Sequence, residues 1–325
     1  MKALLFRQKG AAEKVLEFAD THIADLLPGE VRVKVLASPI NPADFMFIEK
    51  TYRVEPVYPQ IAGFEGAGMI VDNGGDENFP VNTLVAFRHK NVWAEYVNIP
   101  KQKLILLPKQ MPVEKAAQLA LNPVTAWALL EESAAKAGEW IILSAAGSAL
   151  SKLIIQLANS KGVKTLALIR ENDQQTPLLN LGVSAVYYAD ADDLELQIQS
   201  LTGGEKIAGF LDAVGGKLAA KVIKAISPNG RIIHYGLFSE QPVTYHNADL
   251  IFKNLIIKGF GIDAWLQSKT DTELKAVWNE LIKAVIKSDF TMEVAAKYSL
   301  DNYEKAIAKS KSGNGGKVLF WMDEH

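Results

Sequence analysis

Residues 139–170 read EWIILSAAGSALSKLIIQLANSKGVKTLALIR, and this stretch decides the fold class. Residues 140–143 and 163–169 are short apolar runs, and residues 153–158 carry apolar side chains at helical spacings of three and four. Strand, tight turn, helix and strand together form a βαβ unit. A helix that starts directly behind such a turn offers free backbone N–H groups and the positive end of its dipole, where a dinucleotide's pyrophosphate binds. The unit therefore predicts a dinucleotide-binding Rossmann domain.

The turn of this unit lacks the usual glycine pattern. Ala146, Ser148 and Ser151 stand where G-x-G-x-x-G would place glycine. Small side chains still permit a close approach of the backbone to a ligand, and we expect Gly147 to supply the conformational freedom of the turn. Taken alone, the loop is equally typical of ordinary α/β packing.

Arg170 ends the second strand of the unit. An acidic residue at this position would hold the ribose 2′-OH of NAD, whereas an arginine can fork onto a 2′-phosphate. The alternative interpretation is a surface arginine at a strand end. We predict that the cofactor is NADPH.

The composition limits the classes of function. The 325 residues suggest about two domains, and 49% hydrophobic with 22% charged residues is typical of a soluble globular protein. A formal net charge of −2 argues against nucleic-acid binding, and the lack of cysteine excludes disulfides, thiolate nucleophiles and cysteine-ligated metals. We recognise no signal peptide or membrane span, so we expect a cytoplasmic protein that binds no membrane.

Residues 1–120 read as β-rich. Short runs with β-branched or aromatic residues alternate with Pro, Gly, Asn and Asp, and they predict a compact, partly open barrel. The predicted strands are 2–6, 30–37, 68–71, 83–87 and 93–99.

The stretch 38–68 is rich in glycine, proline and aromatic residues, which indicates a loop-rich segment of the kind that often binds ligands. We single out Tyr52 within it, because a phenol can hydrogen-bond a carbonyl oxygen and donate a proton. The alternative is that Tyr52 only packs the loop.

Residues 111–136 read as helical, with an interruption at Asn122-Pro123. Pro123 can open a new helix with Asn122 as its N-cap. Asn122 and Thr125 then line a cofactor cleft, or they serve the cap alone.

Beyond Arg170 the α/β alternation continues, which predicts a parallel, doubly wound sheet that binds ligands at the carboxyl ends of its strands. Gly215, Gly216 and Gly236 fall at such ends, where they allow close approach of a ligand or simply form turns. The predicted helices are 176–181, 194–201 and 218–226, and the predicted strands are 185–188, 209–213, 231–235 and 255–260.

The C-terminal part, from about Trp265, predicts an amphipathic helix that packs a core, because apolar residues repeat at helical spacing between 274 and 285. A turn and a strand over 313–321 follow. We expect this strand to pair with the first domain. The catalytic domain is then discontinuous, 1–121 with 263–325, and the NADPH-binding Rossmann domain, 122–262, is inserted in it.

A series of short motifs resembles the medium-chain dehydrogenase/reductase superfamily. These motifs are INPAD (40–44), GFEGAG (63–68), NPVTA (122–126), AAGSALS (145–151), DAVGG (212–216) and GKVL (316–319). The resemblance covers essentially the whole chain. It implies an α/β fold in which a doubly wound Rossmann domain is inserted in a GroES-like, partly open β-barrel domain.

Zinc alcohol dehydrogenases of this superfamily carry a cysteine ligand and a histidine in a G-H-E motif. Phe64 stands in the histidine's place, and there is no cysteine. The five histidines are scattered and show no ligand spacing. We therefore expect no catalytic metal.

Of the zinc-free branches, the chain looks closer to the mitochondrial-type 2-enoyl thioester reductases than to the quinone reductase-like group. The N-P-x-T-A motif, the Ala-Ala turn with serine and the arginine that ends the second strand have counterparts in that family. The resemblance implies that Tyr52 is catalytic and that Arg170 takes the 2′-phosphate. It also implies these cofactor-binding residues: Asn41, Asn122, Thr125, Ala146, Gly147, Ser148, Ala149, Leu150, Gly215, Tyr235, Gly236, Leu237, Phe260, Ile262 and Lys317. The family's turn continues Gly-Val-Gly, where this chain has Ala149-Leu150-Ser151.

We hypothesise hydride transfer from NADPH to an activated C=C bond of a small-molecule substrate, a 2-enoyl thioester or enone, with the Tyr52 hydroxyl stabilising the enolate. The alternatives are an NADPH:quinone reductase-like enzyme and a non-catalytic NADPH-binding protein. The strand 255–260 is predicted to be a sheet edge, and with the resemblance it implies a homodimer.

Overall fold

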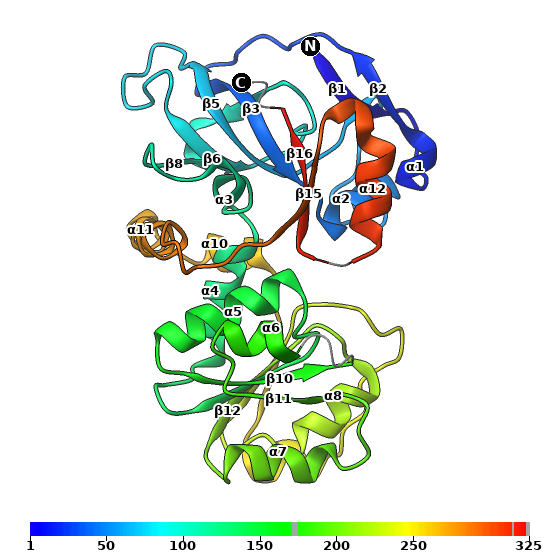
Figure 1. The fold of residues 1–325 in the computed structure, drawn as a ribbon, viewed down its shortest axis with the longest axis vertical. Coiled ribbons are helices and arrows are strands. Elements are labelled where there is room, and N and C mark those ends of the chain that lie inside the picture. The colour runs from blue at the N-terminus through cyan, green and yellow to red at the C-terminus, as the bar shows by residue number, and fades with distance from the viewer. Residues whose placement is uncertain (171–174, 314, 323–325) are drawn as a thin grey trace. The chain divides into compact units, whose positions relative to one another are not determined.

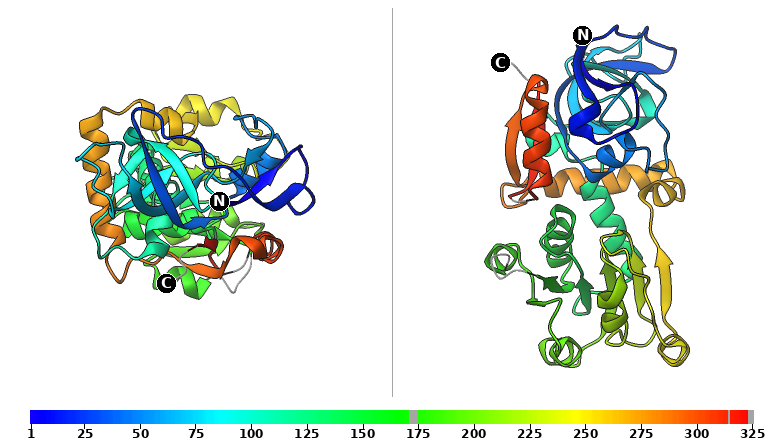
Figure 2. Two further views of the ribbon diagram at one scale, coloured as in Figure 1. Left: turned by 90° about the horizontal axis from the view of Figure 1, so that it is seen from above. Right: turned by 90° about the vertical axis from the view of Figure 1, so that its right-hand side faces the viewer.

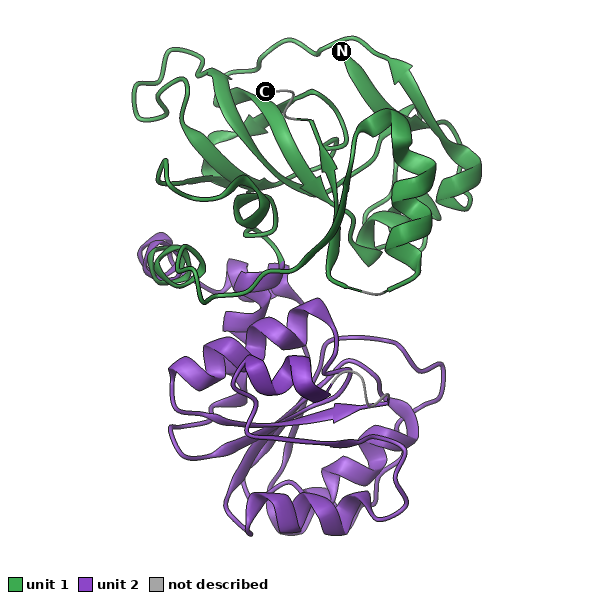
Figure 3. Cartoon of the chain, viewed as in Figure 1, with its two compact units in different colours: residues 1–121, 278–325 green, residues 122–277 purple. Residues whose placement is uncertain are grey.

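The computed structural model describes residues 1–170, 175–313 and 315–322. The chain divides into two compact units, Met1–Leu121 with Trp278–His325, and Asn122–Val277 (Figure 3). We describe each unit by itself, and the domain boundaries expected from the sequence stay predictions.

The first unit is built on a seven-stranded sheet in the order β15-β16-β3-β5-β6-β8, with β7 also paired to β3. A separate three-stranded sheet has the order β2-β1-β4. The strands are β1 (Lys2–Phe6), β2 (Leu16–Asp20), β3 (Glu30–Pro39), β4 (Gln60–Ile61), β5 (Glu65–Asp72), β6 (Leu84–Arg88), β7 (Tyr96–Pro100), β8 (Leu104–Leu106), β15 (Val294–Tyr298) and β16 (Lys317–Trp321). The predicted strands of this unit are thus present, with shifted ends, whereas β2, β4, β8 and β15 were not predicted.

The alternation of charge and valine in β3 has the expected result. Val31, Val33 and Val35 are buried in a core with residues of β5, β6 and β7, because alternate side chains of a strand point to one face. The C-terminal strand β16 pairs antiparallel with β3, with Leu319 opposite Pro39. The predicted return of the tail to the first part of the chain is therefore observed.

The loop-rich stretch 38–68 also contains the helix α2 (Pro42–Ile48), which was not predicted. Pro42 fits the first turn of a helix, and Asp44 Oδ2 accepts a hydrogen bond of 2.7 Å from the Asn41 N–H. The Asn-Pro-x-Asp start signal was present in the sequence. The other helices of this unit are α1 (Ala12–Val15), α3 (Val113–Ala117) and α12 (Tyr303–Lys311), with 3₁₀ turns η1 (Lys101–Lys103) and η3 (Leu300–Asn302). Helix α12 packs against β15 and β16 (Figure 2).

The second unit is a parallel six-stranded sheet in the order β11-β10-β9-β12-β13-β14. This is the 3-2-1-4-5-6 order of the Rossmann fold, whose strand order reverses between β9 and β12. Figure 1 shows α5 and α6 on one face of the sheet and α7 and α8 on the other, so the predicted doubly wound α/β fold is confirmed. The strands are β9 (Trp140–Leu143), β10 (Lys164–Ile169), β11 (Ala185–Tyr188), β12 (Ile207–Asp212), β13 (Arg231–His234) and β14 (Ile256–Gly259).

The strand β9 is buried along its whole length, which explains its continuous apolar sequence. The strand β12 is also buried along its whole length, and its only charged residue is Asp212 at its end. The helices of this unit are α4 (Asn122–Ser133), α5 (Ala149–Ser160), α6 (Gln175–Asn180), α7 (Leu194–Thr202), α8 (Gly216–Ile223), α9 (Asn247–Lys253) and α10 (Ile262–Gln267). Helix α11 (Asp271–Val285) spans the sequence boundary of the two units. The sequence predicted Asn122 as the N-cap of α4. In the structure it is instead the first residue of the helix. No helix in the described part of the chain has the length and apolarity of a membrane span.

Candidate active site

Tyr52 follows α2 in the sequence of the first unit. Its N–H donates to the Met46 carbonyl at 3.1 Å, and its half-buried ring packs against the ring of Phe64 with 5.6 Å between the centroids. The guanidinium of Arg53 lies 5.5 Å from the centroid of the Tyr52 ring. These contacts hold the phenol ring in one place, as a catalytic side chain requires.

A polar cluster of Asn41, Asp44, Glu65 and Lys317 lies in the same unit. Lys317 Nζ donates to Asn41 Oδ1, and Asn41 Nδ2 donates to Glu65 Oε2 at 3.0 Å. The other Glu65 oxygen accepts the Leu121 N–H at 2.7 Å. Two predicted cofactor residues, Asn41 and Lys317, are therefore in direct contact, and Glu65 joins them.

Burial changes the protonation of this cluster. Burial raises the pKa of Asp44 to about 7 and the pKa of Glu65 to about 7, and the Lys317 ammonium partly opposes both shifts. Burial also lowers the pKa of Lys317. Burial therefore favours the neutral, protonated form of both carboxyls. Glu65 lies within the GFEGAG motif, and no role was predicted for it.

In the turn between β9 and α5, the residue with a positive φ is Ala145 and not Gly147. Ala145 has a positive φ of 47°, and Gly147 is not among the positive-φ residues that the structure describes, so the prediction for Gly147 is wrong. A left-handed alanine costs about 1–2 kcal/mol. Such strain persists only where the surroundings enforce it, and it is common at ligand sites.

The first turn of α5 can accept an anion. Ser148 is the N-cap, and its hydroxyl oxygen accepts the Ser151 N–H at 3.2 Å. The N–H groups of Ala149 and Leu150 have no hydrogen-bond partner within the described residues. Two free amides at the positive end of the helix dipole match the pyrophosphate of a dinucleotide, so these residues fit the expected cofactor.

Ser151, which replaces a glycine of the usual pattern, is buried and does not extend into solvent at this turn. Its hydroxyl lies 3.1 Å from Ser148 Oγ and 3.4 Å from the Tyr235 hydroxyl. Burial raises the pKa of Tyr235 to about 12, so Tyr235 stays neutral. The hydroxyls of Ser148, Ser151 and Tyr235 thus form one connected group.

A second network fixes the carboxyl ends of β9, β12 and β13. Asp212 accepts the Ser144 hydroxyl at 2.6 Å and lies 2.9 Å from His234 Nδ1. It also accepts the N–H groups of Val214 at 3.0 Å and Gly215 at 2.9 Å. Although burial opposes its ionisation, the hydrogen bonds lower the pKa of Asp212. No role was predicted for Asp212, and its hydrogen bonds hold the loop that carries Gly215.

Glycine is needed at two predicted positions of this edge. Gly215 has φ 80°, where a side chain is strained. A Cβ at Gly236 would lie 2.6 Å from the Ala213 carbonyl oxygen.

The remaining predicted residues occupy varied positions in the second unit. Arg170 is exposed at the end of β10, and Leu237 is 88% exposed. The Thr125 hydroxyl is buried without a partner among the described atoms, so it is open to a ligand. Phe260 follows β14, and Ile262 begins α10. Their roles, like those of the residues above, stay predictions.

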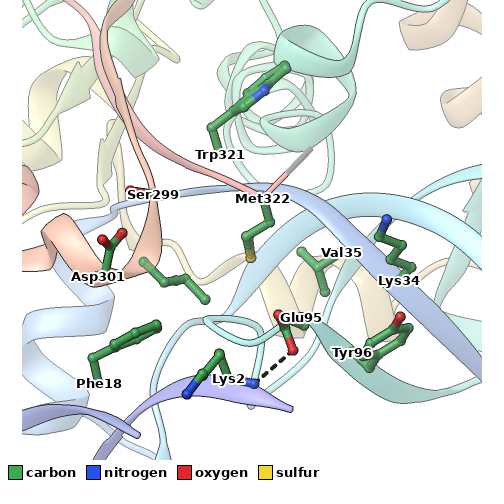
Figure 4. A pocket seen from close by; sticks show the side chains of 11 residues that line it. Lys2, Phe18, Lys34, Val35, Glu95, Tyr96, Ser299, Asp301, Trp321 and Met322 are labelled. Atoms are coloured by element: carbon green, nitrogen blue, oxygen red, sulfur yellow. Dashed lines mark hydrogen bonds between the residues drawn. The ribbon is translucent and has the colours of Figure 1, made fainter. Parts of the chain in front are cut away.

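A cavity of about 560 Å³ in the first unit contains none of the predicted site residues. It is lined by side chains of β1, β2, β3, β7 and β16, and the Lys2 N–H donates to Glu95 across its wall (Figure 4). Within the described residues, no group of three His, Asp or Glu side chains is placed to hold a metal ion.

Comparison with known proteins places these observations in a family. Residues 27–109 match the alcohol dehydrogenase GroES-like domain, and residues 149–288 match the zinc-binding dehydrogenase domain. The mitochondrial enoyl-[acyl-carrier-protein] reductase of Dictyostelium discoideum is 31% identical over 95% of this chain and 91% of its own length. The human enzyme of that name is 27% identical over 95% of this chain and 85% of its own length.

Solved structures of putative NADPH:quinone reductases have the same fold as this chain. A putative NADPH:quinone reductase from Bacillus thuringiensis superposes with a TM-score of 0.90 at 25% identity, covering 99% of both chains. One from Mesorhizobium loti gives 0.88 at 28% identity, covering 99% of this chain and 98% of its own. The chain belongs to the medium-chain dehydrogenase/reductase superfamily, in the group that includes the mitochondrial enoyl-[acyl-carrier-protein] reductases.

Proposed function

We propose that this protein is an NADPH-dependent reductase that adds hydride to the β-carbon of a 2-enoyl thioester. The coarser prediction, an NADPH-dependent oxidoreductase of the enoyl reductase or quinone reductase type, is confirmed by the relatives. The thioester substrate is supported by the Dictyostelium relative, which matches nearly the whole chain.

The observation that carries the proposal is the contact between Tyr52 and Phe64. Phe64 stands where metal-dependent members of the superfamily have a histidine ligand. The Tyr52 ring packs directly on Phe64, with 5.6 Å between the centroids. The Tyr52 ring therefore packs on the residue that replaces the zinc ligand, and we assign its hydroxyl as the hydrogen-bond donor to the carbonyl oxygen that zinc would polarise.

Bound NADPH would supply the hydride. Addition at the β-carbon leaves enolate charge on the thioester oxygen, and the Tyr52 hydroxyl donates a hydrogen bond to that charge. One such donor contributes about 3–4 kcal/mol to the transition state. Tyr52 also gives its proton to the α-carbon, which completes the saturated thioester.

Cofactor binding is assigned to residues of the second unit. The free amides of Ala149 and Leu150 meet the pyrophosphate, and Arg170 forks onto the 2′-phosphate. The unpartnered Thr125 hydroxyl supplies a further hydrogen bond.

Turnover assays separate the candidate functions. Purified protein is given NADPH with crotonyl-CoA or with 9,10-phenanthrenequinone, and NADPH absorbance is followed. We expect thioester reduction that depends on Tyr52. Quinone reduction alone would instead favour the activity named in the two structural neighbours. NADPH binding without turnover of either compound would identify a non-catalytic binding protein.

The proposed assembly is a homodimer formed through β14, which lies at the edge of the six-stranded sheet. Apolar side chains next to this edge are exposed, with Phe252 at 83%, Ile251 at 70% and Ile256 at 48%. An exposed apolar edge is a template for pairing with a second copy. A cytoplasmic location stays a prediction, and the enoyl reductase relatives are named as mitochondrial.

A further inference from the structure

Arg88, a residue without a role so far, ends β6 beside the candidate catalytic tyrosine. In the antiparallel pair of β5 and β6, Arg88 lies directly opposite Glu65. Side chains of directly opposed residues lie on the same face of a sheet, so the guanidinium of Arg88 and the carboxyl of Glu65 are neighbours.

The side chain of Tyr52 is a second neighbour of Arg88, and its interactions with the guanidinium include a hydrogen bond that favours the charged form. Burial lowers the pKa of Arg88, while Tyr52 and Glu65 both act in the opposite direction. Because a guanidinium only donates hydrogen bonds, the phenol oxygen is the acceptor. The single O–H of Tyr52 is then left to donate to another group.

Glu65 is held firmly enough to anchor this arrangement. It is buried, and its two oxygens accept the Leu121 N–H at 2.7 Å and the Asn41 side-chain amide at 3.0 Å. The fixed carboxyl gives Arg88 an electrostatic partner opposite it in the sheet, and Arg88 interacts in turn with the phenol.

We propose that Arg88 is a positioning residue, which directs the Tyr52 hydroxyl toward the substrate and stabilises the oxygen once its proton has left. The proton moves from Tyr52 Oη to the α-carbon of the enolate, forming a C–H bond and leaving a phenolate beside the guanidinium. Water then returns a proton to the phenolate. This inference rests on the proposed enoyl thioester reduction.

A double-mutant cycle tests the inference, with crotonyl-CoA as the substrate and Arg88→Gln, Tyr52→Phe and the double variant as the proteins. A hydrogen bond to a charged group predicts that Arg88→Gln lowers kcat roughly 10–100-fold. KM for crotonyl-CoA and the NADPH dissociation constant should stay within about twofold, because Arg88 is assigned to the transition state. In the Tyr52→Phe background, Arg88→Gln should cost less than about twofold, since its target is gone.

Arg53→Gln is the matched control. Its guanidinium lies against the ring of the same tyrosine, 5.5 Å from the centroid, and it is not assigned to the hydroxyl. It should lower kcat by less than about threefold, as an exposed cation–π contact does. Arg88→Lys, which keeps the charge, should restore part of the lost kcat, and it replaces Arg88→Gln in the cycle if that variant does not fold.

Equal losses from Arg88→Gln in both backgrounds would overturn the inference, because they would show a role that does not pass through Tyr52. Wild-type protein without thioester turnover would overturn the proposed function itself. The two failures are thus distinguished by the wild-type assay.

Discussion

Lys317 Nζ donates a hydrogen bond of 2.5 Å to Asn41 Oδ1 across 276 positions of sequence. The contact exists because β16 returns from the C-terminal part of the chain to pair with β3. It brings two predicted cofactor residues together, and it places them beside Glu65. The cluster of Lys317, Asn41 and Glu65 therefore depends on the pairing of β16 with β3.

The phenol oxygen of Tyr52 is expected to be essential for turnover. Tyr52→Phe removes one hydrogen-bond donor to the enolate and should lower kcat about 100-fold or more, with unchanged NADPH affinity. Stopped-flow turnover of crotonyl-CoA and fluorescence titration with NADPH measure the two quantities. Tyr58→Phe is the control, since Tyr58 packs on Phe6 nearby. A normal rate for Tyr52→Phe would remove Tyr52 from the mechanism.

Arg170 is expected to select NADPH over NADH. Arg170→Ala removes the guanidinium assigned to the 2′-phosphate, so it should weaken NADPH binding by about 10-fold or more, in line with a charge-assisted hydrogen bond, and leave NADH binding nearly unchanged. Fluorescence titrations with NADPH and with NADH give the ratio of the two dissociation constants. Equal weakening of both would show that Arg170 does not read the phosphate.

The buried carboxyls predict an unusual pH dependence of stability. The pKa of Asp44 rises from its ordinary 3.8 to about 7 on folding, so the folded chain binds this proton more tightly than the unfolded chain does. The free energy of unfolding therefore falls as the pH rises through this window, by at most about 1.4 kcal/mol per pH unit for one group.

Asp44→Asn should remove the part of this slope that belongs to Asp44. Urea denaturation at pH 5, 6 and 7 compares the variant with the wild type and with Asp25→Asn, a change at an exposed carboxylate. If the wild type and Asp44→Asn show parallel curves, Asp44 ionises in the folded protein as freely as in the unfolded chain.

Asp212 is expected to stabilise the second unit in the opposite pH direction. Its pKa is lowered on folding, so its contribution is present above its ordinary pKa of 3.8 and is lost as the pH falls through the folded value. Asp212→Ala should cost about 2–4 kcal/mol at neutral pH, because it leaves the Ser144 hydroxyl and backbone amides unpaired. Thermal and urea unfolding against Asp193→Ala, an exposed change, test this magnitude.

The proposed dimer predicts a change of mass on mutation. Phe252→Asp puts a charge on the exposed apolar surface next to β14 and should convert the dimer to a monomer, since a buried unpaired charge is costly. Sedimentation velocity measures the mass, with Leu196→Asp, another exposed apolar side chain, as the control. Wild-type protein that sediments as a monomer would contradict the assembly.

The local elements of the fold could be predicted because they depend on residues that are close together in the sequence. The apolar runs of β9 and β10, with the helix between them, indicated the βαβ unit. The valine alternation of β3 indicated a half-buried strand, and Ser148 at the start of α5 is a residue type that favours N-caps. Helix α2 had its start signal as well, but the surrounding glycines and prolines favoured a loop.

Tertiary structure decided which distant side chains meet. Asp212 with Ser144 and His234, Glu65 with Asn41, and Glu65 opposite Arg88 come from separate strands, and no local pattern states the register that pairs them. Burial also raised the pKa of Glu65, which follows from the atoms around the carboxyl and not from its neighbours in sequence. The sequence by itself thus determined the class of fold and the expected cofactor, whereas long-range packing determined the charges and contacts with which the site works.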